Sequence, residues 1–103
     1  MTKSLPQVSA KEVAGMQKSG HGAMLVCAYD DQENFERIGI SGSISFPVFQ
    51  KKLGSLGKDQ TIVFYCDCPH DELAIEKTAQ FVEQGYDAKV LSGGVAAWQK
   101  AAA

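Results

Sequence analysis

The feature that most constrains the fold is the apolar run Thr61–Tyr65, which is rich in β-branched and aromatic residues. Such a run predicts a buried strand, and we expect it to be central in a sheet. The run leads into Cys66 and then into a short polar stretch before a helical pattern begins. Backbone N–H groups at a helix start are unpaired and carry the positive end of the helix dipole. A cysteine held there ionises more easily than an ordinary one, so Cys66 is the candidate nucleophile.

Strand and helix signals alternate along the rest of the chain. Strand-like runs extend from Ala23 to Cys27, more weakly from Gly42 to Phe46 where Pro47 stops the strand, and from Ala88 to Leu91. Helical patterns extend from Val48 to Leu53, from Asp71 to Gln84, and beyond the Gly93-Gly94 turn through Trp98. This alternation predicts an α/β fold with a mostly parallel central β-sheet and helices on both faces. Ligands of such sheets bind beyond the carboxyl ends of the strands, which is where Cys66 falls.

Two helix ends have recognisable sequence signals. Ser9 and Glu12 have the spacing of a capping box, and Val8 and Val13 have the spacing of a hydrophobic staple. We expect the first helix to begin there and to end near Gly20. Gly85 follows the helix predicted from Asp71 to Gln84, where a left-handed cap is expected.

Composition narrows the functional class. With 103 residues, of which 45% are hydrophobic, the chain suits a single domain over residues 1–103 with a core of about 8–98. A net charge of -2 with scattered Lys and Arg predicts no nucleic-acid partner. The chain has neither a signal-peptide pattern nor an apolar run of about 20 residues, so no membrane insertion is expected. Three cysteines fit a reducing compartment, and we expect a soluble, cytoplasmic protein.

Several short segments, in the order in which they occur along the chain, resemble those of a single-domain rhodanese. They are Leu25-Val26-Cys27, Ile40-Ser41-Gly42-Ser43-Ile44 leading to Pro47, Val63-Phe64-Tyr65-Cys66, Gln84-Gly85-Tyr86-Asp87, and Leu91-Ser92-Gly93-Gly94-Val95-Ala96-Ala97-Trp98. The resemblance implies a rhodanese-like fold in which Cys66 accepts sulfane sulfur from a donor such as thiosulfate or a persulfide. Cys66 would hold that sulfur as a persulfide cradled by backbone N–H groups, and pass it to cyanide or a protein thiol.

The chain departs from the common rhodanese pattern at several positions. Cys27 and Tyr29 stand where an aspartate and an arginine are usual, and Gly39 and Ser41 replace a histidine and a proline. The loop after Cys66 also lacks the basic residue that many members carry, and offers Asp67, Asp71 and Glu72 instead. A subset of rhodanese-like domains has a similar Tyr-Cys-X-Cys-Pro loop followed by an acidic residue, and this chain resembles that subset.

The expected active-site loop is Asp67, Cys68, Pro69, His70, Asp71 and Glu72, and several of its residues have more than one interpretation. Cys68 is a resolving thiol, a second sulfur carrier or merely a small loop residue, although a disulfide so close to Cys66 would be strained. His70 either tunes the thiolate, relays a proton or has no function. Asp71 and Glu72 most simply stabilise the first helical turn, yet near the sulfur they would repel thiosulfate.

Other interpretations of the cysteines carry less weight. Cys66 itself could be an inert core residue, as buried cysteines often are, and we expect that of Cys27. Cys66, Cys68 and His70 lack the spacing of a zinc site, so we expect neither metal nor cofactor. A cysteine-dependent phosphatase needs an arginine on the phosphate oxygens, and no arginine follows Arg37.

The leading functional hypothesis is therefore a rhodanese-type sulfurtransferase or persulfide carrier. The alternatives are a catalytically weak rhodanese-like module that binds a protein through its acidic loop, and a thiol redox sensor that uses Cys66 and Cys68.

Overall fold

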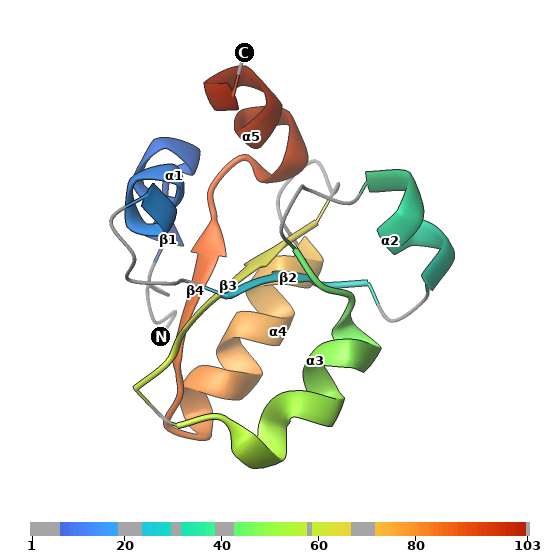
Figure 1. Cartoon of the computed structure of the whole chain (residues 1–103), viewed down its shortest axis with the longest axis vertical. Helices are drawn as coiled ribbons and strands as arrows, with labels where there is room; N and C mark the ends of the chain where they lie inside the picture. Colours follow the sequence, from blue (N-terminus) through green and yellow to red (C-terminus); the bar gives the residue numbers. More distant parts are fainter. Residues whose placement is uncertain are drawn as a thin grey trace.

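The computed structural model describes residues 7–18, 24–29, 32–38, 43–57, 59–66 and 72–102 (Figure 1). These ranges contain four strands, five α-helices and one 3-10 helix. In chain order they are β1 (Gln7–Val8), α1 (Ala10–Lys18), β2 (Met24–Cys27), α2 (Gln32–Ile38), α3 (Phe46–Lys52), η1 (Leu53–Ser55), β3 (Thr61–Tyr65), α4 (Glu72–Glu83), β4 (Asp87–Leu91) and α5 (Gly94–Ala102).

The four strands form one parallel sheet in the order β1-β4-β3-β2. β3 is an interior strand that pairs with β2 on one side and with β4 on the other, which confirms its predicted central place. Ile62, Val63, Phe64 and Tyr65 are all fully buried, as expected for a strand covered on both faces.

Helices cover both faces of the sheet, so the predicted architecture is confirmed (Figure 1). Alternate residues of β3 enter two separate apolar clusters, because successive strand side chains point to opposite faces. Val63 and Tyr65 join the cluster that includes residues of α1 and α5, with Phe35 of α2 packed against it. Ile62 and Phe64 join the cluster built from α3 and α4. That second cluster is rich in aromatic rings, with Phe49 and Phe64 5.6 Å apart between ring centroids.

The predicted helix ends are present. The Glu12 backbone N–H donates to Ser9 Oγ at 3.1 Å, and the Ser9 N–H donates to Glu12 Oε1 at 3.4 Å, which completes the capping box. Val8 and Val13 belong to one cluster, as a staple requires. The helix itself ends at Lys18, and Gly20 lies outside the described residues.

At the other end of α4, Gly85 has a φ of 93°. The Tyr86 N–H donates to the Phe81 carbonyl and the Gly85 N–H to the Val82 carbonyl, both at 3.0 Å. This pair of bonds is a Schellman motif, and it confirms Gly85 as the left-handed cap.

The strand predicted from Gly42 to Phe46 is wrong. Gly42 lies outside the described residues, Ile44 makes a single parallel bridge to Val26, and Phe46 begins α3. Pro47 lies in the first turn of this helix and does not stop a strand. Proline is accommodated there because it lacks an N–H that a first helical turn would leave unpaired anyway. Ser45 caps the helix by accepting a bond from the Val48 N–H.

Two elements lack a counterpart in the sequence-based prediction. β1 has only two residues and exists through its pairing with β4, where Gln7 and Val8 lie opposite Val90 and Leu91. α2 is seven residues long, and its Phe35 packs against the cluster beneath it. Elements this short have too few residues for a periodic signal.

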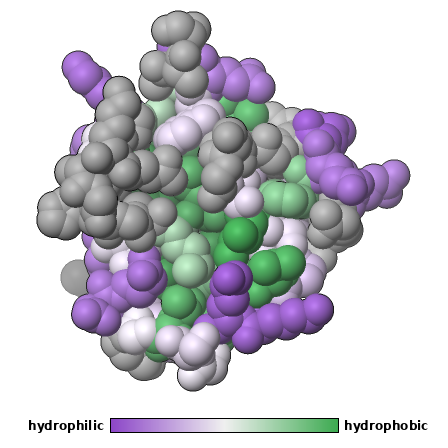
Figure 2. Space-filling view, viewed as in Figure 1, coloured by the Kyte–Doolittle hydropathy of each residue, from purple (hydrophilic) through white to green (hydrophobic). Residues whose placement is uncertain are grey.

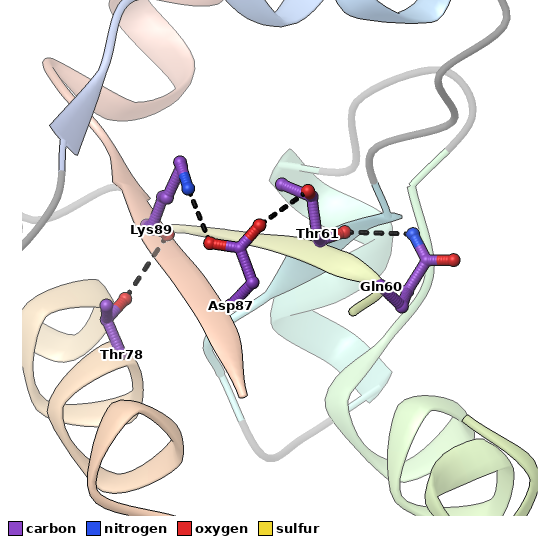
Figure 3. A network of polar contacts seen from close by, with 5 residues as sticks. All are labelled: Gln60, Thr61, Thr78, Asp87 and Lys89. Carbon is purple, nitrogen blue, oxygen red and sulfur yellow. Dashed lines mark hydrogen bonds and ion pairs between the residues drawn. The ribbon is translucent and has the colours of Figure 1, made fainter. Parts of the chain in front are cut away.

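The amino ends of β3 and β4 are joined by polar contacts (Figure 3). Thr61 Oγ1 donates to Asp87 Oδ2 at 2.7 Å, and Lys89 Nζ lies 2.6 Å from Asp87 Oδ1. Thr78 of α4 donates to the Lys89 carbonyl at 3.3 Å. The bond between Thr61 and Asp87 lies at the end of β3 that is away from Cys66.

Hydrophilic side chains dominate the rim of the face seen in Figure 2, and hydrophobic ones show through its middle. Among the helices in the described ranges, none combines the length and apolar character that crossing a membrane requires.

Candidate active site

Cys66 directly follows the last residue of β3, at the carboxyl edge of the parallel sheet. Cys66 is 0% exposed and belongs to the same apolar cluster as Phe64 and Ala74. Because side chains alternate along the strand, Cys66 faces the α3 and α4 side, whereas Tyr65 faces the α1 and α5 side. The candidate nucleophile thus lies at the edge where parallel α/β sheets form their binding sites.

Backbone hydrogen bonds hold the chain on both sides of the cysteine. The Ala28 N–H donates to the Tyr65 carbonyl at 2.8 Å, which extends the β2–β3 pairing to the end of the strand. The Val95 N–H, in the first turn of α5, donates to the carbonyl of Cys66 at 3.4 Å. The amino end of α5 therefore meets the backbone of the candidate nucleophile.

The turn that delivers α5 to this place depends on two glycines. Gly93 and Gly94 have φ values of 83° and 58°, in the region that other residues rarely adopt. A Cβ added to Gly93 would also lie 2.7 Å from the Cβ of Ala97. Backbone conformation thus favours glycine at both positions of the predicted turn, and space requires it at Gly93.

A third segment meets the end of β3 from residues 43–45. The Ile44 N–H donates to the Leu25 carbonyl at 3.0 Å, and the Cys27 N–H donates to the Ile44 carbonyl at 2.9 Å. A hydrogen bond of 2.7 Å joins Ser43 Oγ to the hydroxyl of Tyr65. Sequence reasoning missed this pair, although a tyrosine in an otherwise apolar buried strand is itself a signal that its hydroxyl needs a partner.

Most of the predicted active-site loop lies outside the described residues: Asp67, Cys68, Pro69, His70 and Asp71. Glu72 is the exposed first residue of α4, where a carboxylate meets the positive end of the helix dipole. The structure therefore describes two segments beside the end of β3: the Gly93-Gly94 turn that leads into α5, and residues 43–45.

The other cysteine that the structure describes, Cys27, is fully buried in the cluster on the α1 and α5 side. Its predicted core position is confirmed. Trp98 of α5 packs, partly buried, against the same cluster, as expected of a packing residue. Within the described ranges, no three His, Cys, Asp or Glu residues are close enough to hold a metal ion.

Comparison with known proteins identifies a family whose model matches this chain. The model of the Rhodanese-like domain matches residues 9–101. Among solved structures, the BH2092 protein of Bacillus halodurans superposes with a TM-score of 0.76 at 26% identity, over 92% of this chain and 72% of the other. The Rhodanese-like domain of the Alr3790 protein from Anabaena sp. superposes with a TM-score of 0.71 at 23% identity, over 92% and 74%. No curated protein matches the chain.

A third similar structure bears on the phosphatase alternative. It is the protein of unknown function RPA3614 from Rhodopseudomonas palustris, named "Possible Tyrosine Phosphatase", with a TM-score of 0.63 at 25% identity over 95% of this chain and 82% of the other. In the present chain, no arginine follows Arg37 in the sequence, and Arg37 bonds to Asn34 within α2. The arginine that phosphate transfer needs is therefore missing from the segment that follows Cys66.

Proposed function

The chain belongs to the Rhodanese-like domain family over residues 9–101, and from that membership we propose that it is a sulfurtransferase or persulfide carrier with Cys66 as nucleophile. The observation that carries the proposal is the place of Cys66, directly after the central strand β3 and six residues before the start of α4. A thiol between strand and helix start can be stabilised as an anion by backbone N–H groups.

The reaction has two steps that conserve the thiol. The Cys66 thiolate attacks the outer sulfur of thiosulfate, the sulfur–sulfur bond of the donor breaks, and sulfite leaves with the electron pair. The product is a persulfide on Cys66. An acceptor thiolate then attacks the terminal sulfur and becomes the new persulfide, and the Cys66 thiolate leaves with the electron pair of the broken bond.

The partners that this chemistry needs are a small sulfur donor, such as thiosulfate or a low-molecular-weight persulfide, and an acceptor that includes a protein thiol. We propose that the protein works in the cytoplasm, because Cys27 and Cys66 are both buried as thiols and a reducing compartment keeps such residues competent. The acidic residues of the loop, together with a net charge of -2, favour a donor that is recognised without basic side chains of that loop.

Intact mass measurement tests the nucleophile. After incubation with thiosulfate or a persulfide donor, the wild-type protein should gain the mass of one sulfur atom, and Cys66→Ser should gain none. Cyanide added afterwards should return the wild-type mass to its starting value. Cys27→Ala is the matched control, because it removes a buried cysteine on the other face of the sheet, and it should still load. A wild-type protein that takes up no sulfur from any of these donors would contradict the proposal.

Cys68 needs its own variant. If Cys66 alone carries the sulfur, Cys68→Ser loads to the same extent as wild type. If Cys68 is a second carrier or a resolving thiol, the variant changes the number of sulfur atoms gained or the rate of their release. Peptide mapping after loading identifies which cysteine holds the added mass.

A further inference from the structure

The hydrogen bond between Tyr65 and Ser43 stands at an unusual place for a polar contact. Tyr65 is 0% exposed and is the largest of the fully buried side chains described. Its ring belongs to the cluster of Leu25, Val63 and Leu91, and only its hydroxyl is polar. The oxygen of Ser43, a partly buried residue, lies 2.7 Å from that hydroxyl across a sequence separation of 22 residues.

Filling the core does not by itself require a hydrogen bond between Tyr65 and Ser43. A phenylalanine would fill the same space as the tyrosine ring, and a buried hydroxyl is costly unless it is bonded. When both partners of a buried hydrogen bond are replaced by apolar groups of the same shape, the effect on stability is often nearly neutral. What two hydroxyls add over two apolar groups is a defined distance between two segments of the chain.

The two segments that the bond joins are the ones that surround the end of β3. Ser43 precedes Ile44, whose N–H and carbonyl are both bonded to β2. Tyr65 precedes Cys66, and its carbonyl accepts a bond from Ala28, the residue after β2. The side-chain bond therefore closes a connection between residues 43–45, the end of β2 and the end of β3, one residue before the sulfur.

We propose that Tyr65 and Ser43 are positioning residues for Cys66. Their hydrogen bond holds the last residue of β3 against residues 43–45, and so sets where the thiol is presented at the carboxyl edge of the sheet. The inference rests on the proposed function of Cys66. The Tyr65 side chain acts on the sulfur through the backbone, because it points to the face of the sheet opposite to Cys66.

The expected effect is on the rate of chemistry more than on donor binding. Small displacements of a reacting atom lower the rate of its step, because the attack geometry and the stabilising donors are matched to one position. Tyr65→Phe and Ser43→Ala should each lower the rate of sulfur loading at saturating thiosulfate on the order of tenfold. The thiosulfate concentration that gives half the maximal rate should stay unchanged.

The experiment measures single-turnover loading by intact mass in Tyr65→Phe, Ser43→Ala and the double variant. Because both single substitutions break the same bond, the double variant should be no slower than the slower single one. Ser43→Thr keeps the hydroxyl and should restore a rate near that of wild type. Thr61→Val is the matched control. It removes a hydrogen bond of 2.7 Å that is made on the same face of β3 as Tyr65, at the end of the strand away from Cys66. It should load at the wild-type rate.

A second measurement needs no sulfur donor. In protein labelled with ¹³C at the cysteine Cβ, the resonance of Cys66 is identified by its loss in Cys66→Ser. That resonance should move in Tyr65→Phe and in Ser43→Ala, and stay in place in Thr61→Val. If wild-type protein never loads sulfur while the resonance moves, the proposed reaction fails and the positioning of the thiol stands. If neither the rate nor the resonance changes in Tyr65→Phe, or if Thr61→Val changes both equally, the positioning role is overturned.

Discussion

At the scale of single residues, neighbours in the sequence have different surroundings because a strand alternates its side chains. Tyr65 and Cys66 are both fully buried, yet they belong to clusters on opposite faces of the sheet. One is anchored through its hydroxyl to Ser43 and the other through its carbonyl to Val95. The candidate nucleophile is thus held through its own backbone and through the side chain of its neighbour.

Gly93 is the residue for which a single methyl group should matter most. Gly93→Ala places a Cβ at a φ of 83° and 2.7 Å from the Cβ of Ala97, so we expect a loss of about 1–3 kcal/mol in the free energy of unfolding. Gly15→Ala is the matched control, because nothing lies within 4 Å of its added Cβ in the middle of α1. That control should gain about 0.5–1 kcal/mol. Urea unfolding measures both, and equal stability of the two variants would contradict the argument.

At the scale of elements, the strands and helices that were predicted correctly are those with strong local sequence signals. Thr61–Tyr65, the capped start of α1 and the glycine end of α4 all match the structure closely. Residues 43–46 differ from the predicted strand for two reasons. Ile44 pairs with β2 by a single bridge, which depends on packing that local sequence does not show. Ser45 caps a helix through the Val48 N–H, three residues away, and with Pro47 it forms a local helix-start signal that our prediction takes as the end of a strand.

The amino ends of β3 and β4 give a prediction about pH. Hydrogen bonds from Lys89 and from Thr61 hold the pKa of Asp87 below the ordinary value of an aspartate. A carboxyl group whose pKa is lowered by folding adds stability above its unfolded pKa, and loses it as pH falls through the folded value. The stability difference between wild type and Asp87→Asn should therefore be largest near neutral pH and shrink as the solution is made acidic.

Urea unfolding at a series of pH values measures this difference. Lys89→Met removes the largest cause of the lowered pKa, so its stability should depend on pH less steeply than that of wild type in the same acidic range. Because the side chain of Asp87 is 41% exposed, added salt should weaken the effect. A pH dependence identical in wild type and Asp87→Asn would show that the carboxylate contributes nothing to stability there.

At the scale of the whole molecule, the charge of the chain acts on an anionic donor. The net charge is -2, and the segment that follows Cys66 carries Asp67, Asp71 and Glu72 with no lysine or arginine before Lys77. Repulsion between like charges slows the approach of thiosulfate, and salt screens it over roughly 10 Å at 0.1 M. Binding of this donor should therefore be limited by electrostatics.

We expect the second-order rate of thiosulfate loading to rise with ionic strength. The variant Asp67→Asn, Asp71→Asn, Glu72→Gln should load faster at low salt and depend less on salt. Glu33→Gln, Glu36→Gln and Glu83→Gln together remove the same number of exposed carboxylates from α2 and α4, and serve as the control for net charge alone. A rate that falls with added salt in wild type would show that the loop attracts the donor.

The sequence by itself determined the parts of this protein that depend on neighbours along the chain. The apolar run of β3, the capping box at Ser9 and the left-handed Gly85 follow from side-chain period, local hydrogen bonds and backbone freedom, and these also placed Cys66 between a strand and a helix. Only the tertiary structure decided that β1 pairs with β4, that Ile44 bridges to Val26, and that Ser43 bonds to Tyr65. Those contacts join residues far apart in the sequence, and their formation depends on the packing of the whole sheet, which no local pattern encodes.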